Sequence, residues 1–509
     1  MKRDGSCNSI WQDVGNFIPA EKIFSPQADV VIIGAGITGL STALQLQQQG
    51  KSCILIEANN IGFGTTGGTT AHLNTFFDTP YNKVIKNFSL QKAELLFQSA
   101  KEAMAIIKDN AAGFGIDCNL EDTTGYLFSL NAKQDEELDD IVVAGKKVGL
   151  EINFINDSPF PIPYLKIASI ENQAQFHPLK YIIGLARAFE RAGGTIVQNC
   201  MVTNITGDEM LTIETSQFTI KATHAVYATH IPPGVNLLHF RCVPYRSYAI
   251  AVKLKNNNYP LALGYDMQDP YHYYRTQEID GEQFLIAGGE DHKTGHEENT
   301  GACFRRLESY VKSYFEVDKI VYRWSSQYFE PADGLPYIGY LPGSNSNIFV
   351  ATGYGGNGMT YSSIAAKIIS DMIIEGKSEY QELFDPSRLK PVAGFANFVT
   401  EAAEVVKEFV EKKISKQKIN ELSDIAAGEA KVVKYEGHHI GLYKDELHNI
   451  YAVNAACTHI KCTIAWNNAE KTWDCPCHGS RFSYAGKVLT GPAQQPLEQI
   501  DVRHSQADD

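Results

Sequence analysis

Two short clusters near the end of this 509-residue chain combine cysteine with histidine. The first holds Cys457, His459 and Cys462, and the second holds Cys475, Cys477 and His478, with fifteen residues between His459 and Cys475. Thiolates and imidazoles bind iron in mixed-ligand iron–sulfur centres, and they also bind structural zinc. A two-iron centre, a zinc ion or a disulfide pair alone therefore fits these side chains.

The residues around the clusters favour iron. Each cluster has one cysteine more than four-coordinate zinc requires, and the second continues into Gly479 and Ser480. A later segment, residues 491–497, resembles the proline loop that covers a Rieske cluster. The whole pattern resembles the Rieske iron–sulfur proteins.

That resemblance implies a role for all six side chains. It implies a [2Fe-2S] centre with two thiolates on one iron and two imidazoles on the other, the ligation that raises the reduction potential above that of all-cysteine centres. The implied ligands are Cys457, Cys475, His459 and His478. In Rieske proteins of the cytochrome bc type a disulfide joins the two loops, and the corresponding pair here is Cys462 and Cys477.

A nucleotide-binding pattern occupies the other end of the chain. Residues 28–33 are typical of a buried strand, and Gly34, Gly36 and Gly39 follow at the start of a periodic apolar helix. A second strand ends at Glu57. Such glycines allow a tight turn, close approach of a pyrophosphate and helix–strand packing, and the acid suits a ribose hydroxyl. We therefore expect a dinucleotide site.

The segments that follow resemble the D-amino-acid oxidase and glycine oxidase superfamily from residue 29 to about residue 390. The loop 61–72, with Thr70 and His72, resembles the superfamily's loop after the second strand. The segment 351–360 matches a C-terminal marker and contains Gly355, Gly356, Gly358 and Met359. The resemblance implies FAD as the cofactor, with these residues around it.

Together the motifs predict the fold class and the domains. We expect an α/β FAD-binding fold, a Rossmann-like nucleotide domain plus an antiparallel-sheet substrate domain, followed by a small all-β Rieske domain. The expected boundaries are a lead segment 1–28, the oxidoreductase 29–390, a linker with an amphipathic helix 391–418, and the Rieske domain 419–509.

Three side chains are candidates for binding substrate. The superfamily takes a hydride from the carbon beside an amine, so the resemblance implies an amine or amino acid substrate. A substrate carboxylate needs a cation, and Arg275 and Arg246 each lie beside tyrosines, Tyr274 among them. A structural ion pair is the alternative for each arginine.

Two further features leave alternatives open. The Thr70–His72 segment resembles the loop of sarcosine and dimethylglycine dehydrogenases, in which a histidine bonds covalently to flavin, but an uncoupled histidine beside the ring also fits. Acid precipitation separates the two, because covalent flavin stays in the pellet. Asp291 and His292, with His296 and Glu297, superficially resemble a two-histidine-one-carboxylate iron site, but we expect a solvated loop there.

Charge and cysteine content indicate which binding partners and which cellular compartment to expect. The net charge of −14 gives no electrostatic reason to bind nucleic acid or anionic membrane. The apolar stretch 30–46 contains the three glycines and reads as strand, turn and helix, so we expect no membrane anchor. The six remaining cysteines are scattered, as free thiols would be in a reducing compartment. We expect a cytoplasmic protein.

Three functions fit a chain with both cofactors. The favoured one is a dehydrogenase that oxidises an amine or amino acid at FAD and passes electrons singly through the cluster to an external one-electron acceptor. The second reverses the flow, so that a ferredoxin-like donor feeds FAD through the cluster. The third is a non-enzymatic redox sensor.

The cluster should have a midpoint potential below that of the respiratory Rieske proteins. High-potential members carry a tyrosine two residues after the motif's serine, and its hydroxyl donates to a ligand sulfur, whereas this chain has Phe482. A missing donor destabilises the reduced centre, because hydrogen bonds to sulfur tune the potential. Redox titration measures it, and a midpoint equal to theirs would contradict the argument from Phe482.

Overall fold

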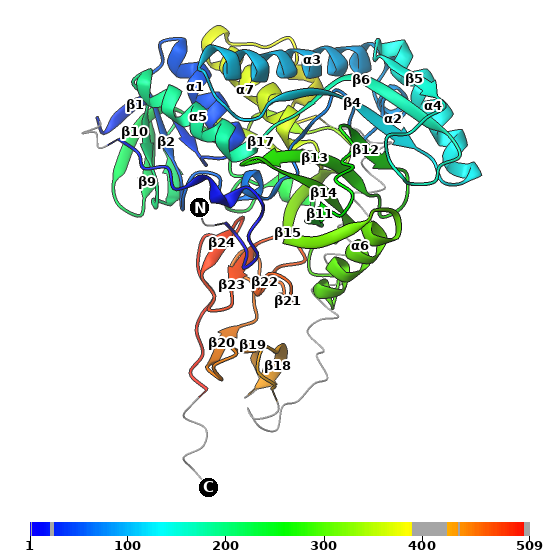
Figure 1. The fold of residues 1–509 in the computed structure, drawn as a ribbon. Coiled ribbons are helices and arrows are strands. Elements are labelled where there is room, and N and C mark those ends of the chain that lie inside the picture. Colours follow the sequence, from blue (N-terminus) through cyan, green and yellow to red (C-terminus); the bar gives the residue numbers. More distant parts are fainter. Residues whose placement is uncertain (2, 21–24, 389–424, 436–437, 503–509) are drawn as a thin grey trace.

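The strand, helix and second strand predicted from the glycine pattern form as β1 (Gln27–Ile33), α1 (Ile37–Gln48) and β2 (Cys53–Ile56). Figure 1 shows the computed structural model, which describes all residues except 2, 21–24, 389–424, 436–437 and 503–509. Residues 30–33 are buried because the sheet is covered on both faces, as expected for a continuous apolar run.

The first sheet runs in the order β16-β17-β10-β1-β2-β7, and β9 and β8 extend it from β10. Its central pairs are parallel, and α1 packs against α5 and α7, with α3 beside α7. In such sheets ligands bind beyond the carboxyl ends of the strands. The bounds are β7 (Thr195–Val197), β8 (Val202–Thr206), β9 (Leu211–Thr215), β10 (Thr219–Tyr227), β16 (Tyr337–Tyr340), β17 (Ile348–Thr352), α3 (Leu90–Gly113), α5 (Pro178–Arg191) and α7 (Gly358–Glu375).

Two glycines make the turn between β1 and α1 possible. Gly34 has a φ of +104°, and a Cβ there would lie 2.6 Å from the carbonyl oxygen of Ala228. A Cβ on Gly39 would lie 1.8 Å from the carbonyl oxygen of Gly34. Any side chain at either position would push the helix away from the strand, so the spacing reflects close packing as well as ligand approach.

The second sheet runs in the order β15-β11-β14-β13-β12-β4-β6-β3, with β5 paired to β6. It is antiparallel as expected, except that β12 pairs parallel with β4. Helix α6 (Thr300–Tyr314) packs against β11 and β14. The bounds are β3 (His72–Leu73), β4 (Glu121–Phe128), β5 (Ile152–Ile155), β6 (Ile167–Gln175), β11 (Cys242–Leu254), β12 (Leu263–Asp266), β13 (Tyr273–Ile279), β14 (Glu282–Lys293) and β15 (Val317–Pro331).

Short helices complete the large part of the molecule. Ser89 and Asn131 accept hydrogen bonds from backbone N–H groups at the starts of α3 and α4, as N-cap residues do. The remaining elements are α2 (Tyr81–Asn87), α4 (Ala132–Val148), α8 (Gln381–Phe384), and the 3₁₀ turns η1 (Gln12–Val14), η2 (Thr65–Gly68) and η3 (Leu237–Phe240). Among the described helices, none is long and apolar enough to cross a bilayer.

The C-terminal part is a small all-β module of two sheets, drawn in orange and red in Figure 1. The predicted fold class is thereby confirmed in all three of its parts. The predicted linker and amphipathic helix at 391–418 lie outside the described residues, so the domain boundaries remain predictions. The strands are β18 (Ala430–Tyr435), β19 (His438–Lys444), β20 (Ile450–Asn454), β21 (Ala465–Asn467), β22 (Thr472–Asp474), β23 (Arg481–Ser483) and β24 (Val488–Thr490).

A buried network of ion pairs joins the C-terminal module to the rest of the chain. Its three cations and three anions come from the first residues, from β11 and from the module, and their side chains are at most 3% exposed. Figure 1 shows the dark-blue N-terminal segment crossing this junction. The members of this interdomain ion network are Arg3, Asp4, Arg246, Glu470, Asp474 and Arg481.

The network satisfies its charges internally. Arg481 pairs with both Asp4 and Asp474, and Arg246 reaches Asp474 at 3.5 Å. Burial by itself raises the pKa of Asp4, but Arg481 and Arg3 outweigh it and hold that pKa below its ordinary value. Because equal numbers of opposite charges are enclosed, the removal of one leaves an uncompensated buried charge.

Glu470 offers a test of this network. Its carboxylate accepts from Arg3 at 3.2 Å and from the backbone N–H of Ser325 at 2.8 Å. We expect Glu470→Gln to lower the free energy of unfolding by about 3 kcal/mol, because breaking the buried pair leaves the charge of Arg3 without its partner. The control Glu282→Gln breaks an exposed pair with Lys253 and should cost less than about 1 kcal/mol. Equal losses in urea titrations would contradict a structural role for the network.

Candidate functional site

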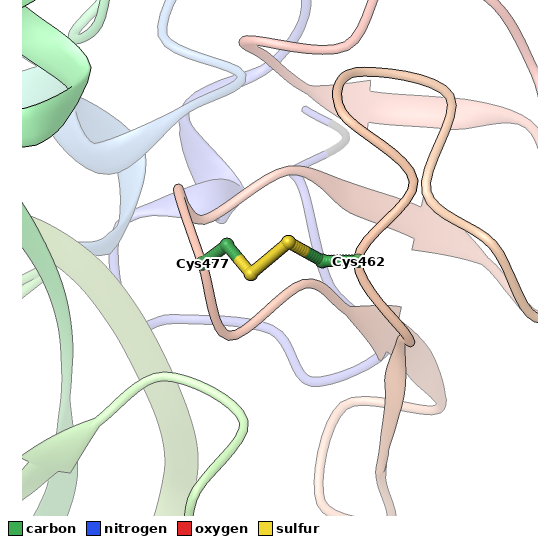
Figure 2. The surroundings of a disulfide bond; sticks show 2 residues. All are labelled: Cys462 and Cys477. Carbon is green, nitrogen blue, oxygen red and sulfur yellow. A yellow bond between two sulfur atoms is a disulfide. The ribbon is translucent and has the colours of Figure 1, made fainter. Parts of the chain in front are cut away.

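The two Cys-and-His clusters lie in facing loops of the C-terminal module. Backbone hydrogen bonds shape each loop, from Cys457 N–H to the carbonyl of Cys462 at 2.8 Å and from Cys475 N–H to that of Ser480 at 2.8 Å. A disulfide bond joins Cys462 to Cys477, the pair that the Rieske resemblance implied, and Figure 2 shows it bridging the loops. The loops are therefore tied together beside the four predicted ligands.

The four predicted ligand side chains converge. Cys457 and Cys475 are buried free thiols, and their mutual hydrogen bond lowers the pKa of Cys457 to about 7. The rings of His459 and His478 lie 5.1 Å apart between centroids. Neither Nδ1 atom has a hydrogen-bond partner within the described part of the chain, although both are buried. Two sulfurs and two unused ring nitrogens fit a [2Fe-2S] centre.

A second group of sulfurs is no alternative metal site. The Sγ atoms of Cys462, Cys475 and Cys477 lie within 4.8 Å of one another. Two of them form the disulfide bond and cannot act as thiolate ligands. The proximity of these three atoms follows from the tied loops, which leaves the mixed set of two cysteines and two histidines as the metal-binding candidate.

The ligand histidines pack against the flavin part of the chain. His459 Nε2 donates to the carbonyl oxygen of Gly234 at 2.9 Å, which leaves Nδ1 deprotonated and able to bind metal. The ring of His239 lies 4.7 Å from that of His459 and 5.6 Å from that of His478. Burial lowers the pKa of His478 to about 3, so its ring is neutral, as a metal ligand must be.

A large cavity lies beyond the carboxyl ends of β1 and β2. Its walls are the turn into α1, the loop 63–70, the second sheet, the turn before α7, and residues 488–494 of the C-terminal module. Most of the predicted cofactor residues line it, namely Gly34, Gly36, Glu57, Thr70, His72, Gly355, Gly356, Gly358 and Met359. Gly39 does not line it but packs α1 on β1, so its contribution is indirect.

The nucleotide end of the cavity fits FAD. A Cβ on Gly36 would lie 3.1 Å from Thr66 Oγ1, a tight contact, so glycine leaves more room at this turn than a residue with a side chain would. Burial raises the pKa of Glu57, while N–H groups of Ala35 and Asn59 donate to its two oxygens at 2.8 Å. A carboxylate fixed in this way can still accept a ribose hydroxyl through its remaining lone pairs.

His72 lies at the other end of the cavity. Its Nδ1 is hydrogen-bonded to Tyr265 OH at 2.7 Å, whereas Nε2 is buried without a hydrogen-bond partner among the described residues. Burial lowers the pKa of His72 well below its ordinary value, so the ring is neutral. The free Nε2 is suited to contact a flavin ring, and both covalent and uncoupled flavin remain open.

The three predicted substrate-binding residues do not line the cavity. Arg275 is buried and donates to the carbonyls of Thr70 at 2.9 Å and Ala71 at 2.8 Å, so it supports the loop before His72. Arg246 belongs to the interdomain ion network. Tyr274 lies on the opposite face of β13 from Tyr273, packed against Phe160. These positions do not favour the predicted binding of a substrate carboxylate.

Other acids and tyrosines face the cavity, and they were not predicted from the sequence. Besides Glu57, two acids and five tyrosines line it, namely Asp78, Asp291, Tyr265, Tyr271, Tyr273, Tyr328 and Tyr354. Asp291 lies within β14 and not in the expected loop, while His292 points to the other face and bonds to Tyr248. Successive side chains of a strand point to opposite faces of the sheet. Knowing which residues of β13 face the cavity would therefore have identified Tyr273, and not Tyr274, as the candidate for binding substrate.

Gln327 connects the cavity to the predicted cluster. Its side chain is 3% exposed, lines the cavity and donates through Nε2 to the carbonyl oxygen of Gly479 at 2.8 Å. Gly479 follows the predicted ligand His478 in the sequence. From the segment 491–497, Ala493 N–H donates to Ser480 Oγ at 3.0 Å, and Ala493 lines the cavity as well. The second cluster loop and the segment 491–497 therefore both meet the cavity wall.

Comparison with known proteins agrees with this geometry. Residues 29–372 match the model of the FAD dependent oxidoreductase family, and residues 415–501 match that of the Rieske [2Fe-2S] domain. YhfW of Bacillus subtilis (strain 168), named as a Rieske 2Fe-2S iron-sulfur protein, is 34% identical over 94% of both chains. Gamma-glutamylputrescine oxidoreductase of Escherichia coli (strain K12) is 24% identical over 72% of this chain and 87% of its own.

A solved structure shares the fold of the large part. Glycine oxidase from Geobacillus kaustophilus superposes with a TM-score of 0.60 at 17% identity, covering 71% of this chain and 99% of its own. The family match and the YhfW relative cover both the cavity and the cluster loops. The chain therefore belongs to the FAD-dependent oxidoreductases and carries a C-terminal Rieske [2Fe-2S] domain.

Proposed function

We propose that the protein oxidises an amine or amino acid at FAD and passes the electrons one at a time through the Rieske centre to an external acceptor. FAD accepts two electrons as a hydride, and a [2Fe-2S] centre carries one. The observation that carries the proposal is the contact of Gln327 with Gly479, because it joins the cavity wall to the loop that holds His478.

The residues of the chain would fix both groups and exclude water between them. The N-terminal segment covers the flavin loop, since Trp11 Nε1 donates to the carbonyl of Thr69 at 2.6 Å and Ser9 Oγ to that of Gly67 at 2.6 Å. Helix α7 begins at the cavity, and its N-terminus favours negative charge there. The interdomain ion network holds the Rieske loops against this wall.

The names of two similar proteins support the substrate class. Glycine oxidase shares the fold, and gamma-glutamylputrescine oxidoreductase shares sequence over most of the large part. An amine nitrogen beside the oxidised carbon is common to the compounds in these names. We extend that feature to the substrate of this chain.

Anaerobic stopped-flow spectroscopy tests the electron path. Mixing the purified holoprotein with amines and amino acids should bleach the flavin absorbance first and the Rieske absorbance afterwards. A flavin that is reduced and then reoxidised by acceptor without reduction of the cluster would contradict the proposal. Reduction of the flavin by a reduced ferredoxin, with no reduction by any amine, would support the reverse direction instead.

Replacement of Gln327 tests the contact itself. Gln327→Leu leaves the buried Gly479 carbonyl without its donor, at a cost of about 1–3 kcal/mol. We expect the rate of cluster reduction, divided by the rate of flavin reduction, to fall roughly tenfold, as 1.4 kcal/mol implies. The control Gln283→Leu alters an exposed residue of β14 and should leave that ratio unchanged. An unchanged ratio in Gln327→Leu would remove this contact from the path.

A further inference from the structure

The end of the cavity opposite the nucleotide carries negative and aromatic groups. Among the described residues that line the cavity, the charged side chains are Glu57, Asp78 and Asp291, and none is lysine or arginine. The two histidines add no positive charge, because burial lowers the pKa of His72 well below its ordinary value and that of His230 to about 4. No lysine or arginine among these described lining residues can therefore pair with a substrate carboxylate.

Asp291 is held ready for a further donor. Tyr328 OH donates to its Oδ2 at 2.8 Å, which fixes the carboxyl group on the cavity side of β14. Its Oδ1 is buried and has no hydrogen-bond partner in the described part of the chain. Burial raises the pKa of Asp291 to about 7, and the charge of Asp78 adds to that increase. A cation placed beside Oδ1 would reverse both effects.

Tyrosine rings surround the same space. Tyr271 and Tyr273 lie 5.6 Å apart between ring centroids, and His72 lies 5.7 Å from Tyr273 and 5.3 Å from Tyr265. Ser247 Oγ and Tyr273 OH are 2.9 Å apart, which fixes the ring of Tyr273. Aromatic faces and a carboxylate together attract alkylammonium groups, as in the sites that bind choline and methylated lysine.

We propose that the substrate is a cationic amine without a carboxylate on the carbon that is oxidised, recognised by Asp291 and the tyrosine wall. This inference rests on the proposed function, because it names the substrate class of the same cavity. An α-amino acid would bring its carboxylate towards Asp78 and Asp291 with no cation to meet it, and a buried unpaired charge is costly. An alkylammonium ion meets a free acceptor and aromatic faces instead.

Matched probes test the charge preference without turnover. Choline, its uncharged carbon isostere 3,3-dimethyl-1-butanol and its carboxylated relative glycine betaine are titrated into the holoprotein at pH 8, where Asp291 is ionised. The shift of the flavin absorption spectrum reports binding. We expect choline to bind at least about tenfold more tightly than either other probe, in line with cation–π and charge contributions. Equal or tighter binding of glycine betaine would overturn the proposal.

Two variants test whether Asp291 causes the preference for the cationic probe. Asp291→Asn should reduce choline binding about tenfold, which corresponds to 1.4 kcal/mol, and leave the isostere unaffected. The control Glu282→Gln, on the exposed end of the same strand, should bind all three probes as the parent does. Flavin content is measured for each variant. Unchanged choline binding in a flavin-loaded Asp291→Asn protein would also overturn the proposal.

A turnover arm separates this inference from the proposed function. Cadaverine and lysine differ only in one carboxylate, and each is mixed anaerobically with the holoprotein while flavin reduction is followed. Faster reduction by cadaverine supports both proposals. Faster reduction by lysine leaves the proposed function intact and overturns the cationic-amine inference. Preferential choline binding without flavin reduction by any amine or amino acid contradicts the proposed function and retains the cation site.

Discussion

The interdomain ion network is the constraint on which the composite site depends. Three arginines and three acids, drawn from segments up to 478 residues apart, cancel one another's charge in a buried junction. Such networks give little net stability compared with apolar packing, but separating any member from its partners leaves an uncompensated buried charge. The Rieske loops are therefore presented to the flavin cavity in a single orientation, which Gln327 completes with a direct hydrogen bond.

The parts of the protein that depend on local sequence were predictable. Gly34 and Gly39 are required by contacts within a single strand–turn–helix unit, and their spacing marks that unit in any chain. The cluster ligands likewise come in two short runs, so cysteine and histidine spacing carries most of the information. The fold class and both cofactors followed from these local patterns and from the resemblance built on them.

Which side chains line the cavity depends on contacts between residues that are far apart in the sequence. Whether Tyr273 or Tyr274 faces the flavin is decided by the parity of β13, and a shift of one residue exchanges the two faces. Arg275 looks like a substrate ligand in sequence, but the carbonyls of Thr70 and Ala71, over 200 residues earlier, occupy its guanidinium. Arg246 is taken up by Asp474 of the other domain. No local pattern contains these pairings.

The two ligand imidazoles have unequal surroundings. His478 is 1% exposed and enclosed by His239 and Phe240, whereas His459 is partly exposed beside Gly234. A centre held by these residues would thus have one histidine ligand inside the protein and the other partly exposed at its surface. In the electron path that we propose, a module docked in this way would exchange electrons with the flavin on one side and with an external acceptor on the other, without the swinging motion that a carrier with a single accessible edge would need.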